Sequence, residues 1–392
     1  MGAPALSPLP SFEFATAARI VFGAGRLTEV GPIAAEIGAH ALLVSGTRDR
    51  VPALVDSLHE HGVATTSFHV PGEPTIALVE QGSELARESG CELVVAIGGG
   101  SVIDAGKAIA ALITNRAPVR DYLEVVGRAQ PLAERPVPFI AIPTTAGTGA
   151  EVTRNAVLMA EEERVKVSLR SPLMLPEVAL IDPELTYSLP PDVTARTGLD
   201  ALSQCLEPFV SPFGSPLTDA VAREGLRRAG GALRRAYHDG ADADARADMC
   251  VASLCGGLSL ANAKLGAVHG FAAPLGGMFP VPHGVACARL LAPVAEANVR
   301  ALRARLPMSP ALGRYEEAAR LLAGRSDARA EDGVAWLQAL VAELRVPSLG
   351  AYGVRSNDVG AVVAQATRAS SMKGNPVVLT DEELSGALRA AL

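Results

Sequence analysis

Residues 93–112 read LVVAIGGGSVIDAGKAIAAL, and this stretch decides the fold. Five apolar residues are followed by Gly98, Gly99 and Gly100, then by Ser101 and a run with helical spacing. A buried strand, a glycine turn and a helix form the phosphate-binding unit of parallel sheets, because glycine lets backbone N–H groups approach a phosphate at the positive helix N-terminus. We therefore predict that these four residues bind a dinucleotide, NAD or NADP. A turn with positive φ is the competing explanation, and it accounts for one glycine rather than three.

Short apolar runs on either side of this stretch predict further strands. They lie at residues 19–22, 41–45, 66–70, 138–142 and 178–181, with helical stretches such as 74–89 between several of them. This alternation indicates parallel strands joined by crossover helices. Two more apolar runs, 156–159 and 165–169, flank a charged tip at 161–164 and predict a hairpin that projects from the sheet.

The pattern changes after residue 189. Long segments rich in Ala, Leu and Arg run with helical spacing to the end of the chain, and strand-like runs nearly disappear. At about 150 residues per domain, 392 residues are enough for two. We predict an α/β domain with a Rossmann-like parallel sheet over residues 1–189 and an all-α domain over residues 190–392.

A second loop, residues 142–153 with the sequence IPTTAGTGAEVT, follows another predicted strand. Its hydroxyl side chains and free amides suit a ribose and a phosphate. Because the carboxyl ends of parallel strands share one edge of a sheet, this loop and the glycine loop are expected to bind the same ligand. Thr144, Thr145 and Thr148 are its candidate cofactor-binding residues.

The composition excludes several kinds of partner. Forty-two acidic residues against 35 basic ones give a net charge of −7, so we expect no nucleic-acid partner and no anionic membrane surface. The cysteines are odd in number and form no CxxC motif, which indicates reduced, buried thiols. They are Cys91, Cys205, Cys250, Cys255 and Cys287. The opening sequence carries no targeting segment, and we expect a cytoplasmic protein.

Candidate metal ligands lie in the predicted helical half. Asp200 and Gln204 are four residues apart and share a helix face, with Glu207 one turn further on. His269 and His283 follow on either side of a Gly/Pro-rich stretch. One carboxylate and two imidazoles from separate segments are typical of a divalent-ion site with an open coordination position. A histidine in an apolar segment is more often a structural residue, and spacing alone does not decide between the two readings.

Two longer motifs surround these residues. The first begins with ALID at 179–182 and continues through Pro190, Ala195, Thr197, the triplet Asp200-Ala201-Leu202 and Glu207. The second, residues 266–286, reads GAVHGFAAPLGGMFPVPHGVA. With both motifs the chain resembles, over essentially all of its length, the iron-containing (group III) alcohol dehydrogenase family, which has the dehydroquinate-synthase-like fold.

The resemblance implies a metal-dependent, NAD(P)-linked oxidoreductase that interconverts an alcohol and an aldehyde or ketone, and a homodimer. It places the divalent metal, Fe²⁺ or Zn²⁺, on Asp200, Gln204, His269 and His283, of which Asp200, His269 and His283 are the catalytic candidates. It also adds two residues to the dinucleotide site. These are Asp104, in the helix after the glycine loop, and Lys166, beside the nicotinamide.

Two residues depart from the family pattern. Gln204 stands where the family normally has a histidine ligand, and Ala273 stands where many members have a histidine near the nicotinamide. An amide oxygen is a weaker donor to iron or zinc than an imidazole. The departures therefore leave open a metal-independent reductase of the maleylacetate reductase type. A lyase or cyclase of the same fold and a non-catalytic ligand sensor are further alternatives.

Cofactor preference and substrate class follow from a few positions. NAD-preferring relatives carry an acid after the second strand, and here that place is Gly46, followed by Thr47, Arg48 and Arg50. Without an acid to repel a 2′-phosphate, we expect NADPH to be accepted. The substrate pocket is expected to be apolar and to suit a short or medium chain. Its predicted lining residues are Leu202, Phe271, Ala273 and Phe279.

Overall fold

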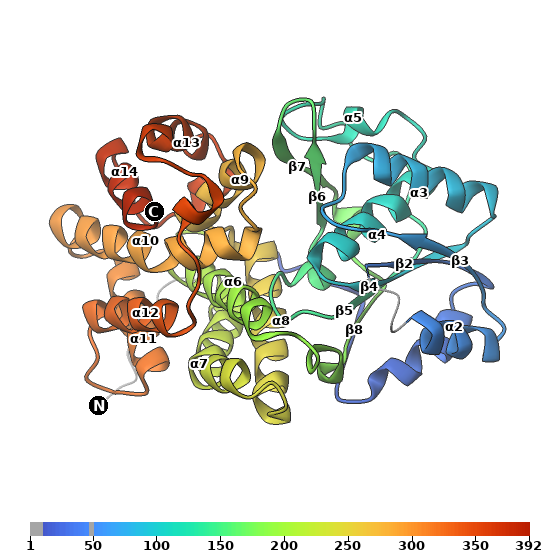
Figure 1. The fold of residues 1–392 in the computed structure, drawn as a ribbon, viewed down its shortest axis with the longest axis horizontal. Coiled ribbons are helices and arrows are strands. Elements are labelled where there is room, and N and C mark those ends of the chain that lie inside the picture. Colours follow the sequence, from blue (N-terminus) through green and yellow to red (C-terminus); the bar gives the residue numbers. More distant parts are fainter. Residues whose placement is uncertain (1–10, 47–50) are drawn as a thin grey trace.

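The computed structural model describes residues 11–46 and 51–392, which form an α/β half and a helical half side by side (Figure 1). Six parallel strands form one sheet in the order β1-β8-β5-β4-β2-β3. Their bounds are β1 (Arg19–Phe22), β2 (His40–Ser45), β3 (Ala64–His69), β4 (Leu93–Gly98), β5 (Phe139–Pro143) and β8 (Val178–Ile181). The predicted strands are therefore confirmed to within two residues at each end.

Helices cover both faces of this sheet. The helices of this half are α1 (Val30–Ala35), α2 (Val51–Glu60), α3 (Ile76–Glu88), α4 (Gly100–Thr114) and α5 (Val119–Tyr122). In β4, Val95 packs into the core with Leu54 of α2, whereas Val94 packs into the core with Ile109 of α4. Because successive side chains of a strand point to opposite faces, a strand covered on both sides is apolar throughout. This is why residues 93–97 form an unbroken apolar run.

The predicted hairpin is present. Strands β6 (Asn155–Ala160) and β7 (Val165–Arg170) pair antiparallel outside the main sheet. Strand β6 packs on α4, and β7 contacts α9 (Ala267–Met278) of the helical half. The hairpin therefore connects the two halves on one side of the molecule (Figure 1).

The rest of the described chain is helical, which confirms the predicted fold class. Besides α9, its helices are α6 (Pro191–Val210), α7 (Pro216–His238), α8 (Ala243–Ala263), α10 (His283–Arg305), α11 (Pro310–Ala323), α12 (Ala330–Glu343), α13 (Val359–Ala366) and α14 (Asp381–Ala390). Short 3-10 helices complete the fold: η1 (Arg26–Glu29), η2 (Ala150–Val152), η3 (Pro172–Met174), η4 (Pro183–Thr186), η5 (Leu349–Tyr352), η6 (Ser356–Asp358) and η7 (Ser370–Gly374). The last strand ends at Ile181 and α6 begins at Pro191, while the domain division at 189/190 stays a prediction.

Helices α6, α9 and α10 pack together in the core of the helical half. Within the described residues, no single helix is both long and apolar enough to cross a membrane. Helices α8 and α9 pass that test only as a pair, and they meet at an angle of 98°.

Candidate metal and dinucleotide site

The glycine loop and the threonine loop lie side by side at the carboxyl edge of the sheet. Strands β4 and β5 are parallel neighbours with Gly98 opposite Pro143, and the backbone N–H of Thr144 donates to the carbonyl of Gly98 at 2.9 Å. A Cβ on Gly100 would lie 2.7 Å from Thr148, and a Cβ on Gly98 would lie 2.5 Å from Val102. The structure therefore brings the two predicted loops together at one edge.

Gly98 and Gly100 are required for space rather than for an unusual backbone. None of residues 98–100 has a positive φ, and Gly99 caps α4 with φ −74°. The competing explanation of a turn with positive φ is therefore wrong for this loop. A side chain at Gly98 would clash with Val102 of α4, and one at Gly100 would clash with Thr148 of the threonine loop.

Gly46 lies at the same edge, directly after β2. The chain runs from β2 outward to β3 and returns to β4 on the other side of β2, so the strand order reverses between β2 and β4. Dinucleotides bind at such a reversal point in open α/β sheets. A Cβ on Gly46 would lie 2.8 Å from Val102. Thr47, Arg48 and Arg50, which follow Gly46 and could contact a 2′-phosphate, lie outside the described residues.

A buried cluster of charged side chains holds the threonine loop in place. Lys107 of α4 donates from Nζ to the carbonyls of Ala150 (2.7 Å) and Asn155 (2.9 Å) and to Thr153 Oγ1 (3.0 Å). Asp104, one turn before Lys107, accepts from the Val157 N–H of the hairpin at 3.1 Å, so the structure gives its carboxylate a positioning role. Contact of Asp104 with the dinucleotide stays a prediction.

Glu151 of η2 completes this cluster and gives a test of it. Burial raises the pKa of Glu151 to about 7, although Lys107 acts against the rise. The folded state then holds the proton more tightly than the unfolded chain, whose ordinary value is 4.5, so stability falls as the pH rises between these values. We expect Glu151→Gln, which mimics the protonated acid, to raise the free energy of unfolding by about 1–3 kcal/mol near pH 8.

Urea unfolding at two pH values checks this expectation. Near pH 5 the gain is expected to be clearly smaller, because the folded wild-type carboxyl is already protonated there. An equal gain at both pH values would show that charge at this position does not matter.

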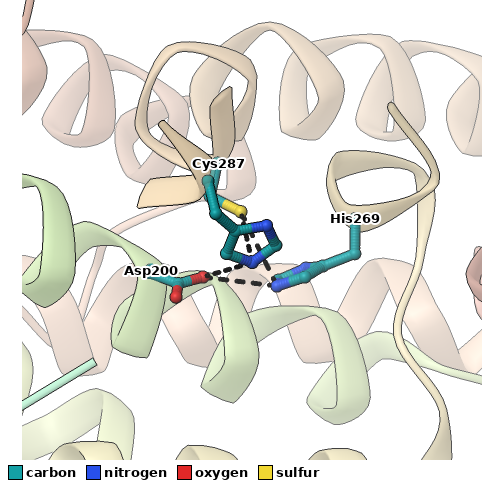
Figure 2. A group of neighbouring side chains, drawn as sticks. Asp200, His269 and Cys287 are labelled. Atoms are coloured by element: carbon teal, nitrogen blue, oxygen red, sulfur yellow. Dashed lines mark hydrogen bonds and ion pairs between the residues drawn. The ribbon is translucent and has the colours of Figure 1, made fainter. Parts of the chain in front are cut away.

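In the helical half, three helices bring four donor groups to one point. Asp200 comes from α6, His269 from α9, and His283 and Cys287 from α10. One donor atom from each lies within 4.8 Å of the other three. Asp200 Oδ1 is 3.3 Å from His269 Nε2 and 3.6 Å from His283 Nε2. Figure 2 shows Asp200, His269 and Cys287 pointing toward one another. The predicted catalytic residues are thus brought together.

Glu207 orients His269 for this arrangement. Its carboxylate accepts from His269 Nδ1 at 2.6 Å and from the Val268 N–H at 2.7 Å. When the imidazole is neutral, this hydrogen bond keeps its proton on Nδ1, so that the lone pair is on Nε2, which faces Asp200. A carboxylate behind a histidine in this way is the usual support of a metal-binding imidazole.

The donor set fits a divalent metal. Asp200 Oδ1 is buried and makes no hydrogen bond of normal geometry, although two imidazole nitrogens lie within 3.6 Å. Burial raises the pKa of Asp200, but His283 and His269 outweigh this and hold it at about 2. The carboxylate is therefore ionised and directed at the centre of the cluster. A buried anionic oxygen and two imidazole nitrogens are ligands that zinc and iron accept.

The site is open on one side. The side chain of His283 is 34% exposed, whereas those of Asp200 and His269 are 2% and 6% exposed. On the hairpin, Lys166 Nζ pairs with Glu73 Oε1 at 2.9 Å and lies beside Gly276 of α9. A small molecule can therefore approach the cluster from the His283 side, near the predicted nicotinamide contact Lys166.

Gln204, the fourth predicted ligand, is buried one turn after Asp200. Its side chain lies against Gly256 of α8, and its amide oxygen has no hydrogen-bond partner. Its role as a ligand stays a prediction.

Cys287 was predicted from the sequence to be a structural cysteine, but it belongs to the donor cluster. Its Sγ lies 3.6 Å from Nε2 of both His269 and His283. Cys287 follows His283 by four residues and shares its helix face, but this spacing alone does not distinguish a ligand from a structural cysteine.

The chain has two loops of the kind that binds a dinucleotide and a cluster of side chains of the kind that binds a divalent metal. Together these features define an NAD(P)-linked, metal-dependent oxidoreductase. Two family models match the chain: "Iron-containing alcohol dehydrogenase" over residues 17–183 and "Fe-containing alcohol dehydrogenase family, C-terminal" over residues 194–392. The chain belongs to the iron-containing alcohol dehydrogenase family, and its activity is the interconversion of alcohols with aldehydes or ketones.

Individual relatives agree with this membership. Choline dehydrogenase from Bacillus subtilis (strain 168) is 36% identical over 389 residues, which cover 95% of this chain and 92% of the relative. A crystal structure of 1,3-propanediol oxidoreductase superposes with a TM-score of 0.90 at 31% identity, covering 98% and 100% of the two chains. Sulfoacetaldehyde reductase from Bifidobacterium kashiwanohense, solved in complex with NAD+, has a TM-score of 0.85 at 30% identity and coverage of 97% and 99%.

Proposed function

We propose that this chain transfers hydride between NAD(P) and a short- or medium-chain alcohol or aldehyde, with Asp200, His269 and His283 holding a divalent metal. One contact carries the proposal. A Cβ on Gly147 of the threonine loop would lie 2.8 Å from Thr197 of α6, and Asp200 follows Thr197 by three residues. The dinucleotide loops and the metal cluster are therefore neighbours.

Each group of residues in the site has a separate role. Glycine and threonine loops bind the pyrophosphate and ribose and so fix the position of the nicotinamide. Asp200, His269 and His283 hold the ion, which when bound supplies Lewis-acid polarisation of a carbonyl oxygen. Ala273 follows His269 by four residues on the same helix face and offers no proton. A water molecule or another polar group must therefore protonate the alkoxide.

The apolar pocket predicted from sequence needs one correction. Leu202 and Phe271 are completely buried in the core of the helical half and do not line an open pocket, because α6 and α9 turn these side chains inward. Ala273 and Phe279 are partly exposed and remain as lining candidates. Choline, 1,3-propanediol and sulfoacetaldehyde, after which three relatives are named, are small molecules with polar ends. We propose that the substrate of this chain is a small alcohol or aldehyde as well.

We propose that NADPH is accepted beside NADH because Gly46 presents no carboxylate. Gly46→Asp is expected to raise KM for NADPH by about 10–100-fold, since the acid repels a 2′-phosphate, and to leave KM for NADH within about threefold. Steady-state kinetics with both cofactors measures this change. Gly46→Asn is the control, because it introduces the same contact with Val102 without the charge. An equal loss in both variants would assign the effect to bulk alone.

We also propose a cytoplasmic homodimer. All five cysteines are free and buried, which agrees with a reducing compartment. The dimer rests on the family resemblance, and sedimentation equilibrium tests it directly.

A panel of alcohols and aldehydes tests the proposed function. Oxidation of NADH and NADPH is followed with each aldehyde, and bound metal is quantified in the same sample before and after chelation. We expect turnover that is lost on chelation and returns with Zn²⁺ or Fe²⁺. Turnover that survives complete removal of metal would favour the metal-independent reductase. Binding of NADH without any turnover would favour a sensor.

A further inference from the structure

Cys287 takes part in the donor cluster although no pattern in the sequence singled it out. It follows His283 on α10, is completely buried, and places Sγ 3.6 Å from the Nε2 atoms of His269 and His283. Beside it lies the buried Asp200 Oδ1, which makes no hydrogen bond of normal geometry. The thiol therefore faces the same point as the three groups proposed to hold the metal.

Gln204 competes with Cys287 for the fourth position. Both side chains are buried, and the amide oxygen of Gln204 has no hydrogen-bond partner. Their donor chemistry differs, because a neutral amide oxygen binds zinc and iron weakly, whereas a thiolate is among the strongest protein ligands of zinc. Two imidazoles, one carboxylate and one thiolate also neutralise a divalent cation, while an amide leaves a net positive charge.

We propose that Cys287, as a thiolate, is the fourth protein ligand of the divalent metal, in the place that the imidazole of position 204 normally fills, and that it makes the site prefer Zn²⁺ over Fe²⁺. This inference rests on the proposed function, because it takes the metal on Asp200, His269 and His283 as given.

The binding step is balanced without any redox change. The sulfur–hydrogen bond of Cys287 breaks as the sulfur–metal bond forms, and the proton leaves to the buffer. Metal uptake through the thiol therefore releases one proton that an amide ligand would not release. Thiolate is a soft ligand, and it increases the affinity of the site for zinc more than its affinity for iron(II).

Cobalt(II) reports directly on a sulfur ligand. Protein freed of metal by chelation is titrated with Co²⁺ alone, and the near-ultraviolet spectrum is recorded together with the bound cobalt. We expect a sulfur-to-cobalt charge-transfer band in the wild type that is absent in Cys287→Ser and Cys287→Ala. Zn²⁺ affinity is measured by competition with a chromophoric chelator. It is expected to fall by at least about tenfold in both variants, because even the loss of a residue that only supports a metal ligand costs about that much.

Two control variants make the result specific. Cys91→Ser removes a thiol from the core of the α/β half and is expected to keep both the band and the affinity. Gln204→Leu removes the amide and is expected to keep the band. Circular dichroism of the metal-free proteins establishes that each variant is folded. A charge-transfer band that persists in folded Cys287→Ser would overturn the proposal, whatever Gln204→Leu shows.

Asp200→Ala separates this proposal from the proposed function. If Asp200→Ala and Cys287→Ser both bind cobalt as the wild type does, the metal lies elsewhere and the proposed function fails with the inference. If Asp200→Ala loses cobalt while Cys287→Ser binds it fully with an unchanged spectrum, only the assignment of Cys287 is wrong. Preference for zinc is read from competition of Zn²⁺ with Fe²⁺ under anaerobic conditions, and equal occupancy in wild type and Cys287→Ser would contradict it.

Discussion

Asp200→Ala is expected to remove the bound metal and to lower kcat/KM for aldehyde reduction by about 10³-fold or more, equivalent to about 4 kcal/mol of transition-state stabilisation. Asp200 supplies the carboxylate of the cluster, and it is ionised and 2% exposed. Without it, the site loses its only carboxylate, and the imidazoles of His269 and His283, whose ring centroids are 5.4 Å apart, keep only the proposed thiolate of Cys287 as an anionic partner. A site that has lost one of its charged ligands holds a divalent ion less tightly.

The measurement combines turnover with bound metal, quantified by mass spectrometry. Binding of NADH, followed by its fluorescence, is expected to stay within about threefold of the wild type, because the dinucleotide loops belong to the sheet and not to α6. Asp200→Asn keeps the shape of the side chain without its charge and is expected to lose metal as well. Full turnover in both variants would remove the metal from the mechanism.

Glu207→Ala is expected to weaken metal binding by about 10–100-fold, or about 1.4–2.8 kcal/mol, although Glu207 is not itself proposed as a ligand. Its carboxylate holds His269 Nδ1 at 2.6 Å and the Val268 N–H at 2.7 Å. Alanine leaves both buried donors without a partner and frees the imidazole to rotate or to move its proton to Nε2, where it would block the metal.

Zinc affinity and kcat are measured together for this variant. Glu207→Gln is expected to lie between alanine and the wild type, because its amide oxygen accepts one of the two hydrogen bonds. Glu382→Ala, at an exposed position of α14, is the matched control and is expected to change neither quantity. A loss of stability in Glu207→Ala with unchanged zinc affinity would reduce Glu207 to a structural residue.

The fold could be predicted from the sequence because its signals are local. In β4 every residue is buried, since α2 and α4 cover opposite faces, and an unbroken apolar run is the direct record of that. The order of the strands in the sheet, with its reversal between β2 and β4, was not predicted and is known only from the structure. Because the carboxyl ends of parallel strands share one edge of a sheet, the glycine and threonine loops were predicted to lie together at that edge.

The candidate site could be predicted from the sequence only in part. Asp200, His269 and His283 were identified from two motifs, and the structure brings them together. Cys287 was missed because a cysteine in an apolar helix is usually structural, and only its distance to two imidazoles gives it another meaning. Lys107 is a similar case, since its three hydrogen bonds reach residues 43 to 48 positions away in the chain.

By itself, the sequence determined the succession of strands and helices, the phosphate-binding loops and the identity of the residues that carry charge or imidazole. The tertiary structure alone decided which donors meet, because packing brings α6 against α9 and α10, whose donor residues follow Asp200 by 69 to 87 positions in the chain. Periodicity records which face of an element is buried, but it contains no information about which other element covers that face. The orientation of His269 by Glu207, the approach of Cys287 and the use of glycine for space are all properties of such contacts.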